Sequence, residues 1–493
     1  MVRRRWRTTP PQRRRTWRVA AGATAGGLAV ACTAVAVAGP WDSGQRTAER
    51  ARAAAEGDAS GQDHTPAAPG EPAPAPSAPE VLSALGAAAE PGGASGDPGT
   101  SADNAPPPPT PSALADALGP LLKDPALGRV RAAAVVDAVT GRELFASSAD
   151  RPVTPASTVK LATAVAVLDA RGPSHRIATR VVREPGRDGR VVLVGGGDPT
   201  VTEEQLDALA ARTARALRAE GAGGTVRLGY DASLYRGPVQ HTIGPNNNLA
   251  PVSPLMVEEA RLDGSRHGPA PRAADPAAEA AREFAQRLGR HGVRTDGRPR
   301  EVTASEEAEK LAVHRSAPLS ALVERMLTHS DNDLAEALAR QTALAEGEPA
   351  SFAGAGEAVR HRLRELGLPV QGARFADGSG LSRADKVTAR LLPRLLGVAA
   401  DPEHPELRAT VTGLPVAGFT GTLGGRYDGA GGAGLVRAKT GTLTGVNALA
   451  GTVVDADGRM LAFAFLTTGT TDRYGAQAAL DRFASALANC GCR

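Results

Sequence analysis

The spacing of apolar and polar residues divides the chain into regions of different character. An apolar run fills residues 19–39, directly after an arginine-rich start. Residues 40–111 consist of Pro, Ala, Gly, Ser and Asp with almost no large apolar side chains, so they cannot bury enough surface to offset the loss of chain entropy on folding. We therefore expect a disordered linker at 40–111 and folded structure from about Ser112 onward.

Two stretches, 112–176 and 311–493, mix short apolar strands with longer helical segments. Pro155 occupies the early helical position that proline favours, and Asp455-Ala-Asp-Gly458 is a tight-turn signal between two apolar runs. We expect strands at 130–136, 143–145, 435–439, 448–454 and 461–467, and helices at 114–118, 155–168, 319–344, 357–366 and 474–488. Helices combined with antiparallel hairpins indicate one α+β domain built from both stretches, with an antiparallel sheet flanked by helices.

The intervening residues, 177–310, follow a different pattern. Short Val-rich segments predict strands at 180–183, 191–194 and 225–228, and one helix is expected near 277–288. We interpret this region as an inserted β-rich domain.

The N-terminus looks like a targeting segment. Residues 1–18 hold eight arginines and are expected to stay in the cytoplasm, while the apolar run 19–39 is long for the core of a signal peptide and about right for one membrane span. Ala36-Val-Ala38 offers a cleavage site, and Cys32 leaves lipidation as a third option. In each case the remainder of the chain is expected outside the cytoplasm, and the membrane is a partner if the segment is not cleaved.

Composition changes this picture in two respects. The net charge of +4 comes from the N-terminal arginines, so it favours targeting and gives no support to a nucleic-acid partner. Lysine is rare, and unlike arginine a buried lysine can shift its pKa and act as a base, which makes each lysine a candidate. The five lysines are Lys123, Lys160, Lys310, Lys386 and Lys439.

No cofactor or metal ion is expected. The nine histidines show no His-Glu-x-x-His spacing, and Asp198 and Glu336 are better explained as a turn residue and a helix-surface residue. Cys490 and Cys492 are either two exposed thiols or one small disulfide.

Three short motifs carry the candidate chemistry. Ser157-Thr-Val-Lys160 places a hydroxyl and an amine one helical turn apart, where a neutral lysine can take the serine proton. Ser330-Asp-Asn332 offers a proton relay and an amide, although taken alone it is better explained as a helix cap or turn. Lys439-Thr-Gly-Thr442 lies on a predicted strand, whose edge can pair with an extended peptide, while Lys439 supplies a cation that anchors a carboxylate or lowers the pKa of Lys160.

Each motif is weak alone, but their order and placement resemble the signature set of penicillin-binding proteins and serine β-lactamases. The chain is similar to the D-alanyl-D-alanine carboxypeptidase/endopeptidase family, the class C low-molecular-mass penicillin-binding proteins. That resemblance rests on Lys439-Thr-Gly-Thr-Leu-Thr-Gly-Val446, Asp377-Gly-Ser-Gly-Leu-Ser-Arg383 and Gly196-Gly-Asp-Pro199. The chain departs from many relatives by having Gly244-Pro245 where they carry Gly-Trp.

The resemblance implies a role for each motif residue. Ser157 would attack the penultimate D-Ala carbonyl of a peptidoglycan stem peptide, with Lys160 as general base and Ser330 passing a proton to the leaving amine. Asn332 and Lys439-Thr440-Gly441-Thr442 would bind the substrate, and β-lactams would acylate Ser157. A serine β-lactamase and a catalytically idle wall-binding protein remain the alternatives.

Overall fold

The computed structural model of the chain describes residues 106–186, 190–427 and 431–491. The predicted cytoplasmic segment, the signal or anchor segment and most of the predicted linker lie outside these residues. Among the described residues, no helix has the length and apolar character needed to cross a membrane.

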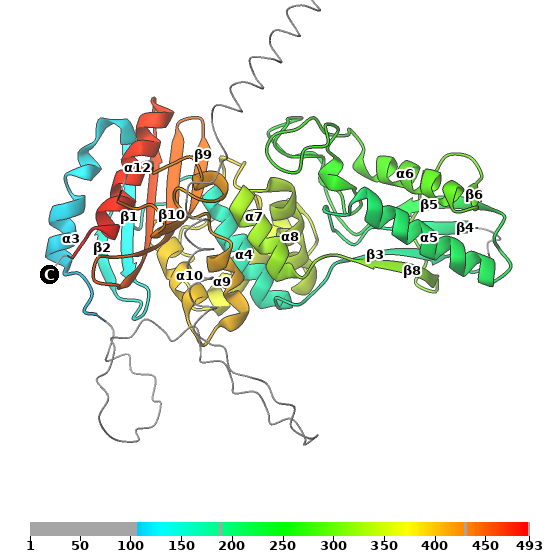
Figure 1. Cartoon of the computed structure of the whole chain (residues 1–493), viewed down its shortest axis with the longest axis horizontal. Coiled ribbons are helices and arrows are strands. Elements are labelled where there is room, and N and C mark those ends of the chain that lie inside the picture. Colours follow the sequence, from blue (N-terminus) through cyan, green and yellow to red (C-terminus); the bar gives the residue numbers. More distant parts are fainter. Residues whose placement is uncertain (1–105, 187–189, 428–430, 492–493) are drawn as a thin grey trace, which may run out of the picture. The chain divides into compact units, whose positions relative to one another are not determined.

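Five antiparallel strands form the larger sheet, in the order β2-β1-β11-β10-β9 (Figure 1). The strands are β1 Val130–Asp137, β2 Glu143–Ser147, β9 Val436–Leu443, β10 Val446–Val454 and β11 Met460–Thr468. The predicted hairpin at 130–145 and the predicted C-terminal meander are both present. β9 is an edge strand: residues 415–417 bond to the outer side of its start, and no described strand lies beyond its later residues, so a ligand can pair there.

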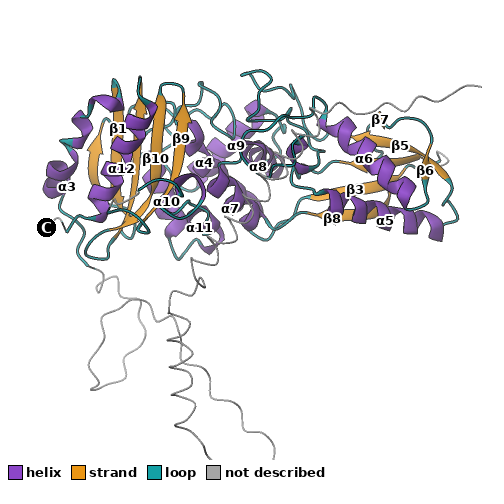
Figure 2. Cartoon of the chain, turned by 45° about the horizontal axis from the view of Figure 1, so that its top comes forward, coloured by secondary structure: helices purple, strands orange, loops and turns teal. Residues whose placement is uncertain are grey.

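Helices cover both faces of this sheet (Figure 2). Alternate strand residues pack against α3 and α12 on one face, and the others pack against α4, α7, α8, α9 and α10 in a second core. The helices are α3 Pro111–Leu118, α4 Lys160–Arg171, α7 Leu319–His329, α8 Asn332–Ala345, α9 Phe352–Glu365, α10 Leu391–Ala400, α11 Ala409–Thr412 and α12 Arg473–Ala488. Short 3-10 turns are η2 Leu121–Lys123, η3 Pro125–Leu127, η4 Ala156–Val159, η6 Pro405–Leu407 and η7 Gly421–Leu423. The predicted α+β class is confirmed, whereas the single helix predicted at 319–344 is in fact α7 followed by α8.

The inserted region has a sheet of its own. Its order is β6-β5-β4-β3-β8, with β7 paired to β5, and β4 runs parallel to β5. The elements are β3 Ala178–Arg183, β4 Arg190–Val194, α5 Glu203–Ala219, β5 Thr225–Asp231, η5 Glu258–Ala260, α6 Pro276–Arg290, β6 Arg294–Thr295, β7 Arg300–Glu301 and β8 Glu309–Arg315. β8 pairs with β3, so this sheet continues past the predicted boundary at residue 310.

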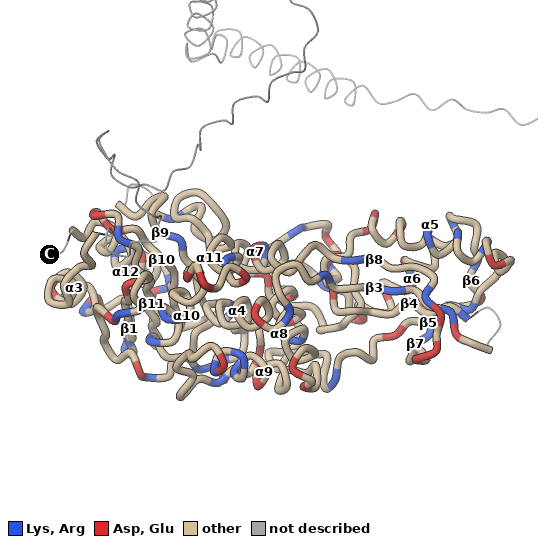
Figure 3. Tube along the Cα trace, turned by 90° about the horizontal axis from the view of Figure 1, so that it is seen from below, with Lys and Arg blue, Asp and Glu red and all other residues tan. Residues whose placement is uncertain are grey.

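The insert is also more helical than its Val-rich pattern indicated. α5 was not predicted, although its start carries a capping box in which Thr202 and Gln205 satisfy each other's backbone N–H groups. α5 and α6 pack together on one face of the smaller sheet. Figure 3 shows basic and acidic residues interspersed along the described chain, with no single-sign stretch along the insert.

Candidate active site

The first motif forms a strained turn at the start of α4. Ser157 lies in η4, which continues directly into α4, and its Oγ is 3.1 Å from the Lys160 Nζ. Ala156, just before the serine, has φ +49, a left-handed conformation that costs a non-glycine residue on the order of 1 kcal/mol. A Cβ on Gly380 would lie 2.1 Å from the Ala156 carbonyl oxygen, and a Cβ on Gly441 would lie 2.6 Å from that of Pro155. These two glycines therefore allow the packing that holds the serine turn in place.

Lys160 is completely buried beneath this turn. Its Nζ donates to Ser157 Oγ, to Asn332 Oδ1 at 2.7 Å and to the Ser379 carbonyl oxygen at 2.6 Å. Burial lowers the pKa of Lys160 to about 8, although nearby carboxylates, Asp377 first among them, oppose this shift. A substantial share of Lys160 is thus neutral near pH 8 and able to accept a proton.

The second motif is the corner between α7 and α8. Ser330 ends α7 in a left-handed conformation with φ 56, and the Asp331 side chain caps α8 by accepting from the Leu334 N–H at 3.0 Å. The helix-cap interpretation is therefore confirmed for Asp331. Asn332, the first residue of α8, also donates from Nδ2 to the carbonyl oxygen of Asn248 in the insert, at 2.9 Å.

The third motif brings a second buried lysine to the same place. Lys439 on β9 is fully buried, and its Nζ donates to Ser330 Oγ and to the Thr440 carbonyl oxygen, each at 2.9 Å. Burial, and then the charge of Lys160, holds the pKa of Lys439 well below its usual range. The expected lowering of the Lys160 pKa by burial is confirmed, and repulsion between the two buried amines adds to the lowering of the Lys439 pKa.

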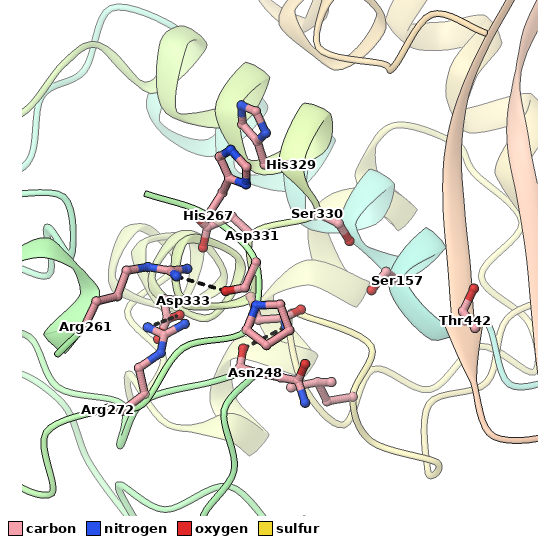
Figure 4. Close-up of a pocket in the computed structure, with 14 residues that line it drawn as sticks. Ser157, Asn248, Arg261, His267, Arg272, His329, Ser330, Asp331, Asp333 and Thr442 are labelled. Atoms are coloured by element: carbon pink, nitrogen blue, oxygen red, sulfur yellow. Dashed lines mark hydrogen bonds and ion pairs between the residues drawn. The ribbon is translucent and has the colours of Figure 1, made fainter. Parts of the chain in front are cut away.

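The remaining residues of this motif lie at the free edge of the sheet. Thr440 Oγ1 donates to Thr422 Oγ1 at 3.0 Å, and Gln477 Nε2 donates to Thr442 Oγ1 at 3.5 Å. Figure 4 shows Ser157, Ser330 and Thr442 around one cavity of about 220 Å³, which Asn332 also lines. The structure thus brings all three motifs together.

The Asp377-Gly-Ser-Gly loop packs against the buried Lys160 and supplies one of its hydrogen-bond acceptors. Asp377 accepts from the backbone N–H groups of Ser379, Gly380 and Ser382, and His241 Nε2 lies 2.8 Å from its carboxylate. Burial raises the pKa of Asp377, but the hydrogen bond with His241 and further bonds outweigh it, so the net pKa is lowered. The ionised carboxylate holds the loop that delivers the Ser379 carbonyl to Lys160.

Glu336 accepts hydrogen bonds from the same loop, and the prediction that it lies on a helix surface is wrong. It is fully buried and accepts from the Gly378 N–H at 3.1 Å and the Ser379 N–H at 3.0 Å, while Arg340 pairs with its other oxygen at 2.9 Å. Burial and the charge of Asp377 raise the pKa of Glu336. The turn expected at Asp198 is present, since its Oδ1 accepts from the Thr200 N–H at 2.9 Å.

Sequence reasoning missed a second ionic cluster beside the corner. Carboxylate oxygens of Glu259, Asp331 and Asp333 lie within 4.8 Å of one another, a grouping that could hold a metal ion. Three guanidinium groups face them instead: Arg261 and Arg325 pair with Glu259, and Arg272 pairs with Asp333 at 2.8 Å. The donor set therefore favours ion pairing over metal binding. We refer to these six residues as the carboxylate–arginine cluster.

Comparison with known proteins agrees with this geometry. The model of the D-Ala-D-Ala carboxypeptidase 3 (S13) family matches residues 114–271 and 263–487. The chain belongs to this family. Carboxypeptidase Rv3627c of Mycobacterium tuberculosis is 38% identical over 402 residues, covering 76% of this chain and 84% of that protein. A D-alanyl-D-alanine carboxypeptidase of an Actinomadura strain is 33% identical over 454 residues, and the match covers 72% of this chain and 83% of that protein.

The fold is also found among solved structures. Penicillin-binding protein 4 of Haemophilus influenzae matches with a TM-score of 0.63 at 23% identity, covering 76% of this chain and 98% of that one. This chain is therefore an α+β serine-type D-Ala-D-Ala peptidase, as its motifs predicted. Cys490 is disulfide-bonded, and the other predicted member of that pair, Cys492, lies outside the described residues.

Proposed function

We propose that Ser157 is the nucleophile and Lys160 the general base of a D-Ala-D-Ala peptidase that acts on peptidoglycan stem peptides. The observation that carries this proposal is the 3.1 Å contact between Ser157 Oγ and a fully buried Lys160 whose pKa is about 8. A neutral Lys160 takes the hydroxyl proton while Oγ attacks the carbonyl carbon of the penultimate D-Ala. The peptide bond breaks, the terminal D-Ala leaves, and water then hydrolyses the acyl-enzyme.

The free edge of β9 supplies the groups that stabilise the intermediate. Leu443 and Val446 flank a two-residue turn and form its hydrogen-bonded pair, so Thr442 turns its backbone N–H away from β10. Together with the backbone N–H of Ser157, it forms the oxyanion hole. Loss of one such donor costs roughly 10²–10³ in rate.

Proton delivery to the leaving amine uses the link between the second and third motifs. Lys439 donates to Ser330 Oγ at 2.9 Å, which leaves the serine hydroxyl hydrogen free to point at the leaving nitrogen. The hydroxyl of Thr442 binds the terminal carboxylate, and that of Thr440 joins it by turning its one hydrogen from Thr422 to the substrate.

Asn332 holds the substrate amide. Its Oδ1 accepts from Lys160, and one N–H of Nδ2 donates to Asn248. The amide carries a second N–H, which is available for the carbonyl of the acyl half of the substrate.

Labelled penicillin tests this proposal. The chain is expected to form one long-lived adduct on Ser157, Ser157→Ala should form none, and Ser112→Ala, an exposed serine at the start of α3, should label normally. Labelling of Ser157→Ala would refute the assignment. Rapid turnover of the adduct would favour a β-lactamase, and a folded wild type without label would favour a catalytically idle wall-binding protein. Digestion of purified muropeptides then measures release of D-Ala and cleavage of cross-links.

We also propose that the enzyme works outside the cytoplasm. The wall peptide is an extracytoplasmic substrate, and the disulfide of Cys490 fits an oxidising compartment. Fractionation of cells that express the full chain, followed by penicillin labelling of each fraction, tests this. Labelled protein confined to the cytoplasm would refute it, and membrane pelleting would separate an anchored form from a secreted one.

A further inference from the structure

The cavity at Ser157 continues past Ser330 to two arginines of the insert. Arg261 and Arg272 line its far end, and each side chain is only 4% exposed (Figure 4). His329, which lies on this wall next to Ser330, stacks on His267 of the insert with ring centroids 4.7 Å apart. The cavity therefore has a catalytic end and a cationic end.

Arg272 has donor capacity left over. Its Nη1 lies 2.8 Å from Asp333 Oδ2 and donates to the Glu259 carbonyl oxygen at 2.6 Å. Its Nε is buried and has no hydrogen-bond partner among the described residues. A buried donor without a partner is costly, so the described part of the protein alone does not satisfy the guanidinium of Arg272, and an anion in the cavity would draw it toward this wall.

The charges of the carboxylate–arginine cluster also favour an anion. Burial and the charge of Asp331 raise the pKa of Glu259 to about 9, so near neutral pH this side chain is uncharged. Burial raises the pKa of Asp333 to about 6 against the opposing effect of Arg272, so Asp333 is mostly ionised, as is Asp331. Three guanidinium groups then face two carboxylates, so the cluster has a net charge of +1.

Backbone strain marks the same wall. Glu258, Glu259 and Ala260 all adopt left-handed conformations, with φ of 47, 56 and 55. Three such residues in succession persist only where the surroundings fix them, and strain of this kind gathers at ligand sites. The turn places Arg261 against the cavity and buries Glu259 behind it.

We propose that this cationic end binds a carboxylate on the leaving half of the substrate, in addition to the carboxylate held by Thr440 and Thr442. The inference rests on the proposed function, since Ser330 serves the leaving amine and the cavity extends beyond it. Free D-Ala has one carboxylate, whereas the leaving half of a cross-linked peptide carries more. The site therefore favours cross-link cleavage over trimming of single stem peptides.

Two synthetic substrates with the same acyl half test this. In both, the leaving residue is a D-lysine acylated on its side-chain amine, by a succinyl group with a free carboxylate in one and by the matching amide in the other. We expect wild-type kcat/KM to favour the carboxylate by about tenfold or more, as for a charge-assisted hydrogen bond. The double variant Arg272→Gln/Asp333→Asn removes the guanidinium together with its paired carboxylate and so keeps the net charge of the cluster, and it should cleave both within about twofold. Arg227→Gln, an exposed arginine elsewhere in the insert, should keep the wild-type preference.

Penicillin titration of Ser157 counts the active sites in each preparation and separates the two proposals. A wild type that is not labelled refutes the proposed function itself. A labelled wild type that cleaves both substrates equally refutes only the carboxylate site. A preference that survives in the double variant also refutes it, because the preference then arises elsewhere.

Discussion

Two buried ionic clusters meet at the α7–α8 corner, and neighbouring residues belong to different ones. Asn332 faces Lys160, which with Lys439 forms a pair of buried amines beside two serine hydroxyls. Asp331 faces the other way, into the carboxylate–arginine cluster. Burial acts on both clusters and disfavours the charged form in each.

The chemical outcome is opposite because the groups differ. A buried amine becomes neutral by losing a proton, which leaves a lone pair that can act as a base. A buried carboxyl becomes neutral by keeping its proton, which removes the base and leaves a hydrogen-bond donor. The pKa of Lys160 falls to about 8, whereas that of Glu259 rises to about 9. The lysine cluster therefore activates Ser157, whereas the carboxylate–arginine cluster is suited to bind a carboxylate of the substrate.

Removal of the base should give the largest effect. Lys160→Met keeps the length of the side chain but no proton acceptor, so we expect acylation by penicillin to slow by about 10²–10⁴-fold. Lys386→Met is the matched control, because that lysine bonds to Thr154 outside the cavity and its loss should change acylation little. Heat unfolding checks that both variants are folded. A Lys160→Met rate within tenfold of wild type would mean that another group takes the serine proton.

The pH dependence of acylation gives the next largest effect. Since Lys160 must be neutral to accept the proton and its pKa is about 8, the rate should rise about tenfold per pH unit up to pH 8 and level off above it. Stopped assays with labelled penicillin between pH 6 and pH 10 measure the profile. A flat profile between pH 6 and pH 8 would contradict a lysine base.

The motifs and most of the main-domain elements could be predicted because they depend on local sequence. Apolar alternation located β1, β10 and β11, and the spacing of Ser157 and Lys160 required only one helical turn. The break at Ser330 had a local signal in the helix-cap residues Ser330-Asp-Asn332, but the left-handed conformation of Ser330 depends on how α7 and α8 pack.

The parts of the site that were missed depend on long-range burial. Glu336 has the pattern of an exposed helical residue, and only the fold shows that it bonds to Gly378 and Ser379. Glu259 and Asp331 are 72 positions apart in number, and nothing local indicates that they share a proton. Burial also determines the direction of the pKa shift of Lys160, Lys439 and Glu259, whereas hydrogen bonds and neighbouring charges outweigh it at Asp377 and Asp331.

Glu259→Gln should give the smallest effect, and one that depends on pH. Near pH 5 the Glu259 carboxyl is protonated in the folded protein, so the amide replaces a group of the same charge and the free energy of unfolding should change by less than about 1 kcal/mol. A pKa raised from 4.5 to about 9 means that the folded state binds the extra proton, so the stability of the wild type falls as the pH rises through this window. The variant has no such proton, so its free energy of unfolding should rise relative to that of the wild type toward pH 9, by at most about 1.4 kcal/mol per pH unit.

Urea unfolding of both proteins at pH 5, 7 and 9 measures the difference, and Asp331→Asn supplies the contrast. Burial raises the pKa of Asp331, but hydrogen bonding from Glu259 and the charge of Arg325 outweigh it, so Asp331 is ionised. Its replacement leaves Arg325 with one carboxylate fewer and should cost about 1–3 kcal/mol at every pH above 5. If the two variants behave alike, the proton is not held by Glu259, and the positive charge assigned to the cationic end of the cavity has no basis.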